Sequence, residues 1–296
     1  MPRFGRIMSA MVTPFDADGA VDYDVAQRLA RHLVAEGNDG LVVCGTTGES
    51  PTLSDDEKLA MFAAVLEAVD VPVIAGTVGY DTAHSIALTA RAAQLGVHGI
   101  LSLCPFYSRP SQAGIEAHFR AIAAACELPQ LIYDIPVRTG RKVATDVLVR
   151  LAHEVPNVVG VKDAAGNPAE TARLIADTPD EFEVYSGDDP LTLPLLAVGA
   201  VGTIGVATHW TAPDHVEMFD AWARGDIAGA RRANRRMLES FAFETGDLAP
   251  NPIPTKAMLR TLGWQVGQCR LPVGPAPEWV EPRAREVWEK LVNNRG

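Results

Sequence analysis

Residues 158–162 read Val-Val-Gly-Val-Lys, an apolar run of strand length that ends in a lysine. The preceding run of this kind, at residues 130–133, reads Gln-Leu-Ile-Tyr and ends in a tyrosine. We expect partial desolvation at such a strand end to lower the pKa of Lys162 from the reference value of about 10.4. A neutral amine can form a Schiff base with a carbonyl compound, and Tyr133 beside it could transfer the protons. The alternative is that Lys162 only extends into water and Tyr133 only packs in the core.

Eight apolar runs rich in Val, Ile and Leu recur along the chain, about 20 to 32 residues apart, as strands do in repeated strand–helix units. The runs lie at about Ile7–Val12, Gly40–Cys44, Val71–Gly76, Gly99–Cys104, Gln130–Asp134, Val158–Lys162, Phe182–Ser186 and Gly202–Val206. They show no polar alternation, so both faces of each strand are expected to be buried, as in a parallel barrel. Between the runs apolar residues recur with the helical period, for example Val25, Leu29 and Leu33. The sequence therefore predicts an α/β fold, a (β/α)8 TIM barrel.

The C-terminal part of the chain predicts more helices than a barrel needs. A barrel of this kind typically takes about 250 residues, and this chain has 296. Helical stretches are expected at about Pro213–Arg224, Ile227–Glu244, Ile253–Leu262 and Glu278–Asn293. We therefore expect a catalytic barrel over residues 1–212, and the final barrel helix with a C-terminal helical appendage over residues 213–296.

Capping residues mark several helix starts. Ser54 precedes Glu57 by three positions, as in a capping box. Asn167 and Asp189 each precede a proline, which predicts a cap residue followed by proline at the first helical position.

Composition argues against several kinds of partner. The chain has 26 Lys and Arg against 37 Asp and Glu, a net charge of −11, and no basic cluster to neutralise a run of phosphates. We therefore expect no nucleic-acid partner.

No 18 apolar residues run uninterrupted, and the first apolar stretch is too short for a signal peptide. The four cysteines are far apart, without a Cys-x-x-Cys pair. These features predict a reduced, cytoplasmic protein that does not bind a membrane.

No metal or cofactor is expected. His209 and His215 lie five residues apart, without nearby cysteines or a His-Glu-x-x-His helix, and are expected at the surface or at helix caps. No Gly-x-Gly-x-x-Gly follows a strand, so a dinucleotide is not expected either.

Polar motifs follow the predicted strands at the end where barrel active sites lie. Gly45-Thr46-Thr47-Gly48 has the composition of an anion nest that could bind a small carboxylate, although an ordinary strand-to-helix turn would have the same composition. Arg138 could offer its planar guanidinium to a second carboxylate, or be a solvated surface charge.

Six motifs occur together in the order of one family. They are Gly45-Thr46-Thr47-Gly48-Glu49-Ser50, Pro105-Phe106-Tyr107, Tyr133-Asp134-Ile135-Pro136 with Arg138-Thr139-Gly140, Gly160-Val161-Lys162-Asp163, Ser186-Gly187-Asp188-Asp189 and Asn251-Pro252-Ile253-Pro254-Thr255-Lys256. From about Arg6 to at least Lys256 the chain resembles the dihydrodipicolinate synthase/N-acetylneuraminate lyase family of Schiff-base aldolases. The resemblance implies condensation of pyruvate with L-aspartate 4-semialdehyde to 4-hydroxy-tetrahydrodipicolinate, on the route to lysine and diaminopimelate.

The resemblance also implies residue roles. Lys162 forms the Schiff base, while Tyr133, Thr46 and Tyr107 form a proton relay, and Tyr107 reaches into a neighbouring subunit of a homotetramer, a dimer of dimers. The residues that bind substrate are Thr47 and Ile204 for pyruvate, Gly187 on the same rim, and Arg138 for the carboxylate of aspartate semialdehyde.

Two other functions stay open at this point. One is a pyruvate-forming aldolase of the same family that cleaves a 2-oxo sugar acid or hydroxy-oxoglutarate, against which Arg138 and the segment 251–256 argue. The other is a catalytically silent binding or regulatory protein on the aldolase fold, against which the intact Lys162, Tyr133 and Thr46 argue.

The chain departs from the commonest family pattern at a few positions. Asp134 stands where Asn is frequent, and Asp163 where Glu is frequent. Asp134 is expected to add a negative charge close to the site.

Feedback by lysine, which many family members bind between paired subunits, is expected to be weak or absent. The matching positions carry Asp55, Lys58, Tyr80 and His84. Lys58 would repel the ammonium group of lysine, and His84 supplies no permanent carboxylate.

Overall fold

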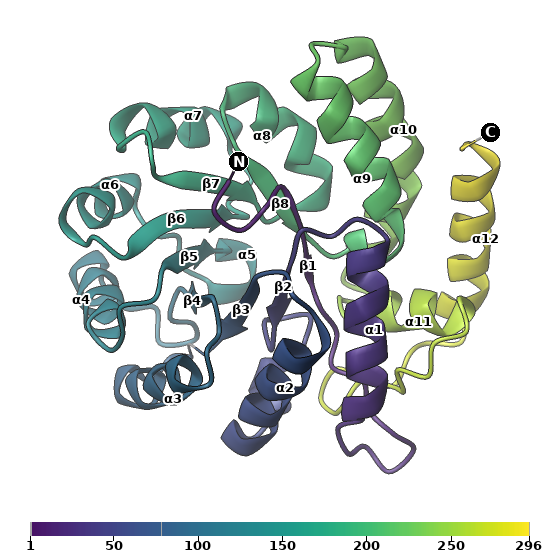
Figure 1. The fold of residues 1–296 in the computed structure, drawn as a ribbon, viewed down its shortest axis with the longest axis horizontal. Coiled ribbons are helices and arrows are strands. Elements are labelled where there is room, and N and C mark those ends of the chain that lie inside the picture. Colours follow the sequence, from purple (N-terminus) through teal and green to yellow (C-terminus); the bar gives the residue numbers. More distant parts are fainter. Residues whose placement is uncertain (1, 78, 296) are drawn as a thin grey trace. The chain divides into compact units, whose positions relative to one another are not determined.

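The chain folds as a closed barrel of eight parallel strands with helices between them, in a computed structural model that describes residues 2–77 and 79–295 (Figure 1). The strands are β1 (Ile7–Ala10), β2 (Gly40–Val43), β3 (Val73–Gly76), β4 (Gly99–Leu103), β5 (Gln130–Asp134), β6 (Val158–Asp163), β7 (Glu183–Ser186) and β8 (Gly202–Gly205). Each lies within about two residues of its predicted position. The predicted (β/α)8 fold is therefore confirmed.

The described chain divides into two compact units. One comprises Pro72–Ile204 with the N-terminal residues up to Gly5, and the other comprises Arg6–Val71 with the residues from Gly205 on. The expected barrel boundary after residue 212 falls within helix α9 (Thr208–Ala223) and stays a prediction.

The unit around Pro72–Ile204 contains β3 to β7, β8 as far as Ile204, and the helices that lie between these strands. The helices are α3 (Thr82–Gln94), α4 (Gln112–Ala123), the single turn α5 (Pro136–Thr139), α6 (Thr145–Glu154), α7 (Pro168–Asp177) and α8 (Thr192–Val198), with a 3-10 turn at Asp189–Leu191. Its core joins helix residues Phe119, Leu151 and Leu174 to strand residues Ile132 and Val161, all buried. This packing covers β5 and β6, which pair side by side in the barrel.

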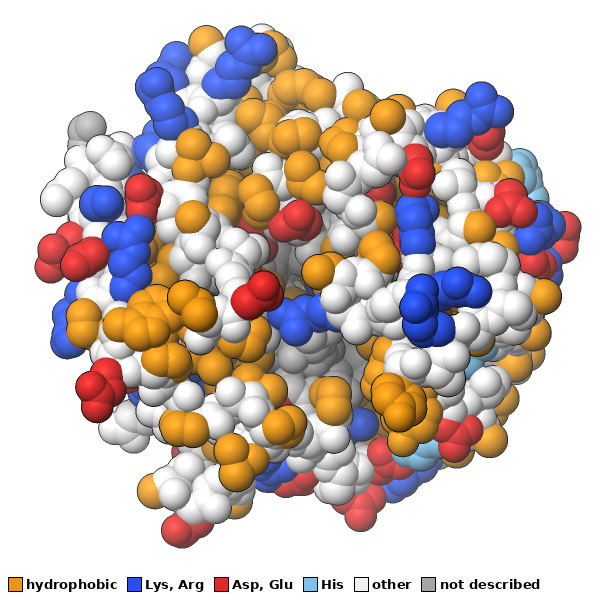
Figure 2. Space-filling view, turned by 180° about the vertical axis from the view of Figure 1, so that it is seen from behind, with side chains coloured by type: hydrophobic (Ala, Val, Ile, Leu, Met, Phe, Trp, Pro, Cys, Tyr) orange, Lys and Arg blue, Asp and Glu red, His pale blue; other side chains and the backbone are white. Residues whose placement is uncertain are grey.

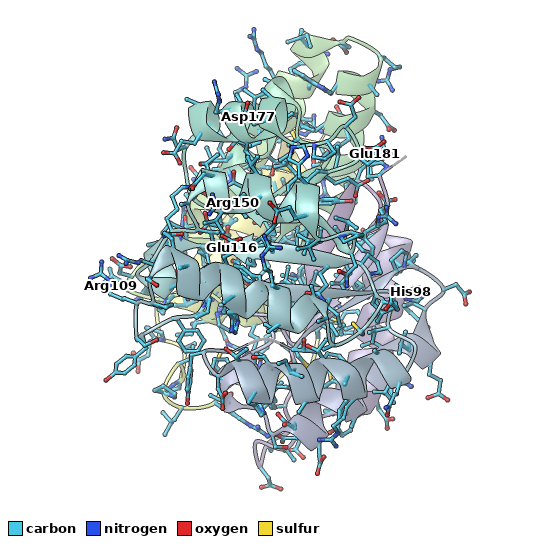
Figure 3. The ribbon with its side chains drawn as sticks, turned by 90° about the vertical axis from the view of Figure 1, so that its left-hand side faces the viewer. His98, Arg109, Glu116, Arg150, Asp177 and Glu181 are labelled. Atoms are coloured by element: carbon cyan, nitrogen blue, oxygen red, sulfur yellow. The ribbon has the colours of Figure 1, made fainter. Side chains whose placement is uncertain are left out.

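Ion pairs connect α4 and α6 on the outside of this unit (Figure 3). Glu116 accepts from Arg120 at 2.7 Å and from Arg150 at 2.8 Å, and Arg150 also binds Asp146 at 2.8 Å. The hydrogen bond from Arg150 holds the pKa of Glu116 below its ordinary value. Because these groups are solvated, the network contributes little to stability and mainly fixes the register of the two helices.

The second unit contains β1, β2 and six helices. They are α1 (Tyr23–Ala35), α2 (Asp55–Ala68), α9 (Thr208–Ala223), α10 (Ile227–Glu244), α11 (Ile253–Thr261) and α12 (Val280–Asn293), with a 3-10 turn at Ser50–Thr52. The predicted capping box is confirmed, because Ser54 accepts from the backbone of Glu57 and the Glu57 carboxylate accepts from the backbone of Ser54. The extra C-terminal helices are present as expected.

Two predicted helix starts are wrong. Asp189 does not cap its turn, because it is the first residue of the 3-10 turn and Asp188 precedes it as the cap position. Pro213 lies inside α9, which begins at Thr208. The buried hydroxyl of Thr208 lies 2.8 Å from that of Ser9, so tertiary contacts extend the helix ahead of the proline.

The predicted surface position of two histidines is also wrong. His209 and His215 are both fully buried in α9. His209 Nε2 accepts from the backbone of Val12 at 3.2 Å, while its Nδ1 lies 2.7 Å from the carbonyl of Val206. Burial lowers the pKa of His209 to about 4, so the ring is neutral at physiological pH.

Candidate active site

Lys162 and Tyr133 lie side by side at the ends of β6 and β5. The two residues are paired in the strand register, and Lys162 Nζ lies 4.2 Å from the centroid of the Tyr133 ring. The two residues are 4 % and 5 % exposed, so the amine and the phenol share a desolvated environment. The predicted pairing of an amine with a phenol is thus present, and it places a possible proton carrier next to a possible nucleophile.

Gly187 follows β7 and packs against the stem of Lys162. A Cβ atom at this position would lie 2.8 Å from Lys162 Cγ and 3.0 Å from Cε. Any larger residue would therefore push the lysine from its position. Ile204, at the end of β8, is fully buried. Of the predicted site residues, the structure brings Lys162, Tyr133 and Gly187 together.

Thr46 and Thr47 form a tight turn after β2, in the other compact unit. The backbone N–H of Glu49 donates to the Thr46 carbonyl at 3.0 Å, and Thr47 is 2 % exposed. The Thr47 hydroxyl accepts from Asn251 Nδ2 at 2.9 Å. Gly48 has no room for a side chain, because a Cβ would lie 3.0 Å from the Cα of Cys44. The turn is therefore rigid and partly held by a residue to which the sequence had assigned no role.

Tyr107 and Arg138 lie on two loops of the first unit that contact one another. Arg141 Nε donates to the carbonyl of Pro110 at 3.0 Å, which ties the loop after β4 to the loop after β5. Tyr107 is 93 % exposed and has a positive φ of 68°, a strained conformation for a tyrosine. Arg138 is exposed, on the turn α5, where Thr139 donates to the Ile135 carbonyl at 3.1 Å.

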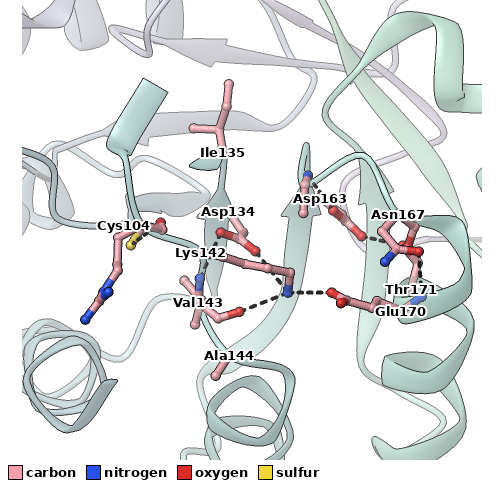
Figure 4. A network of polar contacts seen from close by, with 12 residues as sticks. Cys104, Asp134, Ile135, Lys142, Val143, Ala144, Asp163, Asn167, Glu170 and Thr171 are labelled. Atoms are coloured by element: carbon pink, nitrogen blue, oxygen red, sulfur yellow. Dashed lines mark hydrogen bonds and ion pairs between the residues drawn. The ribbon is translucent and has the colours of Figure 1, made fainter. Parts of the chain in front are cut away.

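Asp134 and Asp163 face away from Tyr133 and Lys162, because successive residues of a strand point to opposite faces. Asp134 Oδ1 accepts from the backbone of Val143 at 3.0 Å, and its Oδ2 lies 3.7 Å from Lys142 Nζ (Figure 4). Burial raises the pKa of Asp134 to about 6. The expected negative charge close to the site thus lies behind the strand and in contact with a lysine.

Asp163 is held by hydrogen bonds in the same region (Figure 4). Its Oδ2 accepts from Thr171 Oγ1 at 2.6 Å, and its Oδ1 accepts from the backbone of Ala165 at 2.9 Å. Lys142 Nζ also lies 3.0 Å from Glu170 Oε2. These contacts fix the ends of the two strands that carry the amine and the phenol.

We expect the variant Asp134→Asn to be more stable relative to the unaltered protein at pH 7.5 than at pH 4.5. The folded pKa of Asp134 is raised, so the folded state binds this proton more tightly than the unfolded state does. Ionisation above the unfolded pKa therefore costs stability, increasingly up to pH about 6, by about 3 kcal/mol at most. Asparagine removes that cost and can still accept from Val143. Urea unfolding at both pH values measures the difference, and an equal change at both would contradict the assignment.

Among residues 2–77 and 79–295, no three His, Cys, Asp or Glu side chains are grouped so that they could hold a metal ion. No helix in the described part of the chain is long and apolar enough to span a membrane. All four cysteines are free thiols. On the face drawn in Figure 2, basic side chains lie interspersed with acidic and hydrophobic ones.

Known proteins of one family are similar to this chain over nearly its whole length. Residues 3–290 match the model of the dihydrodipicolinate synthetase family. A protein of Synechococcus elongatus named 4-hydroxy-tetrahydrodipicolinate synthase is 49 % identical over 276 residues, which cover 92 % of this chain and 91 % of that protein. The protein of that name from Symbiobacterium thermophilum is 49 % identical over 290 residues, 97 % of this chain and 98 % of that protein.

Solved structures of dihydrodipicolinate synthases are similar to this chain over almost its full length. Dihydrodipicolinate synthase from Bacillus anthracis superposes with a TM-score of 0.94 at 40 % identity, covering 98 % of this chain and 99 % of that one. The enzyme from Cyanidioschyzon merolae, with lysine bound, superposes with a TM-score of 0.96 at 41 % identity, covering 99 % of both chains.

Proposed function

The chain belongs to the dihydrodipicolinate synthetase family, and we propose that it condenses pyruvate with L-aspartate 4-semialdehyde to give 4-hydroxy-tetrahydrodipicolinate. This reaction serves the biosynthesis of lysine and diaminopimelate. The observation that carries the proposal is the buried amine of Lys162 beside the ring of Tyr133, at the adjoining ends of β6 and β5. This pair supplies the nucleophile and the proton carrier of a Schiff-base lyase.

The reaction begins when Lys162 attacks the ketone carbon of pyruvate. Water leaves as Tyr133 transfers protons, and Thr46 and Tyr107 complete the proton relay. Thr47 binds the pyruvate carboxylate, while Ile204 and Gly187 complete the pyruvate site. The imine withdraws electrons from the methyl group, which loses a proton to give an enamine.

The enamine then forms the new carbon–carbon bond. It attacks the aldehyde carbon of aspartate semialdehyde, whose carboxylate is bound by the guanidinium of Arg138. The amino group of this substrate displaces Lys162 from the imine and closes the six-membered ring. The lysine amine is thereby released for another turnover.

The working assembly is a homotetramer, a dimer of dimers, in the cytoplasm. Its support is Tyr107, an exposed aromatic side chain on a strained backbone, as expected for a residue that another subunit covers. The side chain inserts into the site of the neighbouring subunit and joins its proton relay. No metal or organic cofactor takes part in this mechanism.

A steady-state assay tests the function. Purified protein with pyruvate and aspartate semialdehyde is expected to give product at a rate far above that with pyruvate and a sugar aldehyde. Cleavage of 2-oxo sugar acids or hydroxy-oxoglutarate to pyruvate and an aldehyde is measured for comparison. Faster turnover of those substrates would identify a different aldolase of the family.

L-lysine at millimolar concentrations is expected to inhibit the enzyme weakly or not at all. Lys58 Nζ lies 3.9 Å from Asp55, so the matching position presents an ammonium group where the ligand would need an acceptor. Tyr80 is exposed and packs edge-on against Phe106, with ring centroids 5.3 Å apart. Titration in the steady-state assay measures this, with D-lysine as the control for ionic strength. Saturable inhibition by the L-isomer alone would overturn the prediction.

A further inference from the structure

The segment Asn251–Lys256 forms part of the resemblance, yet the mechanism assigns it no role. It leads into α11 and contacts the turn after β2 at two points. Asn251 Nδ2 donates to Thr47 Oγ1 at 2.9 Å across a separation of 204 residues, and Lys256 Nζ lies 2.7 Å from Glu49 Oε1. All four residues belong to one compact unit. Part of the C-terminal helical region therefore holds the turn that carries Thr47.

A directed chain of hydrogen bonds ends at Thr47. Thr255 Oγ1 donates to Asn251 Oδ1 at 2.9 Å, which fixes the orientation of the amide, since its oxygen faces Thr255 and its nitrogen faces Thr47. The Thr47 oxygen therefore accepts a hydrogen bond, and its own proton is directed to a different acceptor. Donor chains of this kind also polarise one another, which strengthens the last donor.

A buried ion pair between Glu49 and Lys256 also holds the turn that carries Thr47. Glu49 has a φ of 58°, and its Oε2 accepts from the backbone of Arg270 at 2.8 Å. The side chains of Glu49 and Lys256 are 1 % and 0 % exposed, and Lys256 Nζ lies 4.0 Å from the centroid of the Phe15 ring. Breaking such a pair leaves an uncompensated buried charge, so the pair resists any rearrangement of the turn.

We infer that Asn251 is a positioning residue for pyruvate, which orients the Thr47 hydroxyl so that its proton points to the pyruvate carboxylate. The inference rests on the proposed binding of that carboxylate by Thr47. Asn251 itself does not touch the substrate, and it acts only through the direction of one hydroxyl group. Its effect should therefore appear in the affinity for pyruvate more than in the rate of the chemical steps.

The variant Asn251→Asp reverses the last hydrogen bond, because a carboxylate can only accept and Thr47 must then donate to it. We expect the KM for pyruvate to rise about tenfold or more, and kcat to change less than about threefold. Thr255→Val removes the group that orients the amide without adding a charge, and a smaller rise of about threefold is expected. Thr255→Ser keeps the hydroxyl and should behave as the unaltered enzyme.

Thr261→Val is the matched control. Thr261 lies in the same helix, and its hydroxyl donates to the backbone carbonyl of Ala257 at 3.0 Å, outside the chain that ends at Thr47. This variant is expected to leave the KM for pyruvate unchanged. Circular dichroism identifies variants that do not fold, and Thr255→Val tests the chain in case Asn251→Asp is one of them.

Half-saturation by pyruvate is read from borohydride trapping of the imine, which needs no second substrate. The inference holds if Asn251→Asp and Thr255→Val shift this value and if Asn251→Asp has no further effect in a Thr47→Val background. Unshifted values in folded variants, or an equal shift in the Thr47→Val background, overturn it while the proposed function stands. A missing adduct in the unaltered protein overturns the proposed function and the inference with it.

Discussion

Replacing Lys162 with alanine is expected to abolish imine formation with pyruvate and to lower kcat by several orders of magnitude, as the loss of a covalent nucleophile does. No other lysine can take over, because the geometry of attack depends on the position of the amine beside the Tyr133 ring, 4.2 Å from its centroid. Borohydride reduction in the presence of pyruvate, followed by peptide mass spectrometry, should find the adduct on Lys162 in the unaltered protein and none in the variant.

Lys142→Ala provides the control for this experiment. Lys142 lies in the same compact unit and contacts Asp134 and Glu170, yet it is assigned no part in the reaction. The imine on Lys162 should still form in this variant. An adduct on any lysine other than Lys162 in the unaltered protein would refute the mechanism.

Replacing Arg138 with alanine is expected to impair the second half of the reaction alone. The proposed partner of its guanidinium is the carboxylate of aspartate semialdehyde, and a charge-assisted hydrogen bond contributes about 1.5–3 kcal/mol. The value of kcat/KM for this substrate should therefore fall roughly ten- to a hundredfold or more, while trapping of the pyruvate imine stays unchanged. Arg138→Lys, which keeps the charge without the planar fork, should recover only part of the loss.

The matched control is Arg173→Ala. Arg173 is an exposed arginine on α7 that pairs with Asp177 one helical turn away, so its loss removes the same charge from a residue that is assigned no part in the reaction. Both half-reactions should keep their rates. Equal falls in both half-reactions on replacing Arg138 would make that residue structural rather than selective for the second substrate.

The strands of the barrel could be predicted from the sequence because their burial is a local property. A run such as Val158–Lys162 has no polar face, and in a strand both faces are then buried. Consecutive strands of a (β/α)8 barrel lie side by side, so the predicted fold also predicts the strand order. The pairing of β5 with β6 agrees with this order. The neighbouring positions of Tyr133 and Lys162 follow in turn, since each is the last residue but one of its strand. The sequence by itself therefore predicted the pair on which the proposed chemistry depends.

Only the tertiary structure decided which polar groups meet across long separations. Periodicity reports which face of an element is buried, and it carries no information about the partner of a single hydroxyl, amide or imidazole. Thus His209 was expected at the surface and is buried, and α9 extends ahead of Pro213 because Thr208 is bound by a residue of β1. Asp134 was expected to charge the site and instead faces Lys142.

The hydrogen bond between Asn251 and Thr47 is the clearest example of a contact that the local sequence does not predict. The two residues are 204 positions apart, and each could be a cap or a turn residue by its local sequence. Their hydrogen bond exists because the chain returns to the turn after β2 at the start of α11, where buried amides and hydroxyls must find partners or lose the free energy of their hydration. Local sequence thus determined where the strands lie and which residues end them, and packing determined which of the remaining polar groups hold those residues in place.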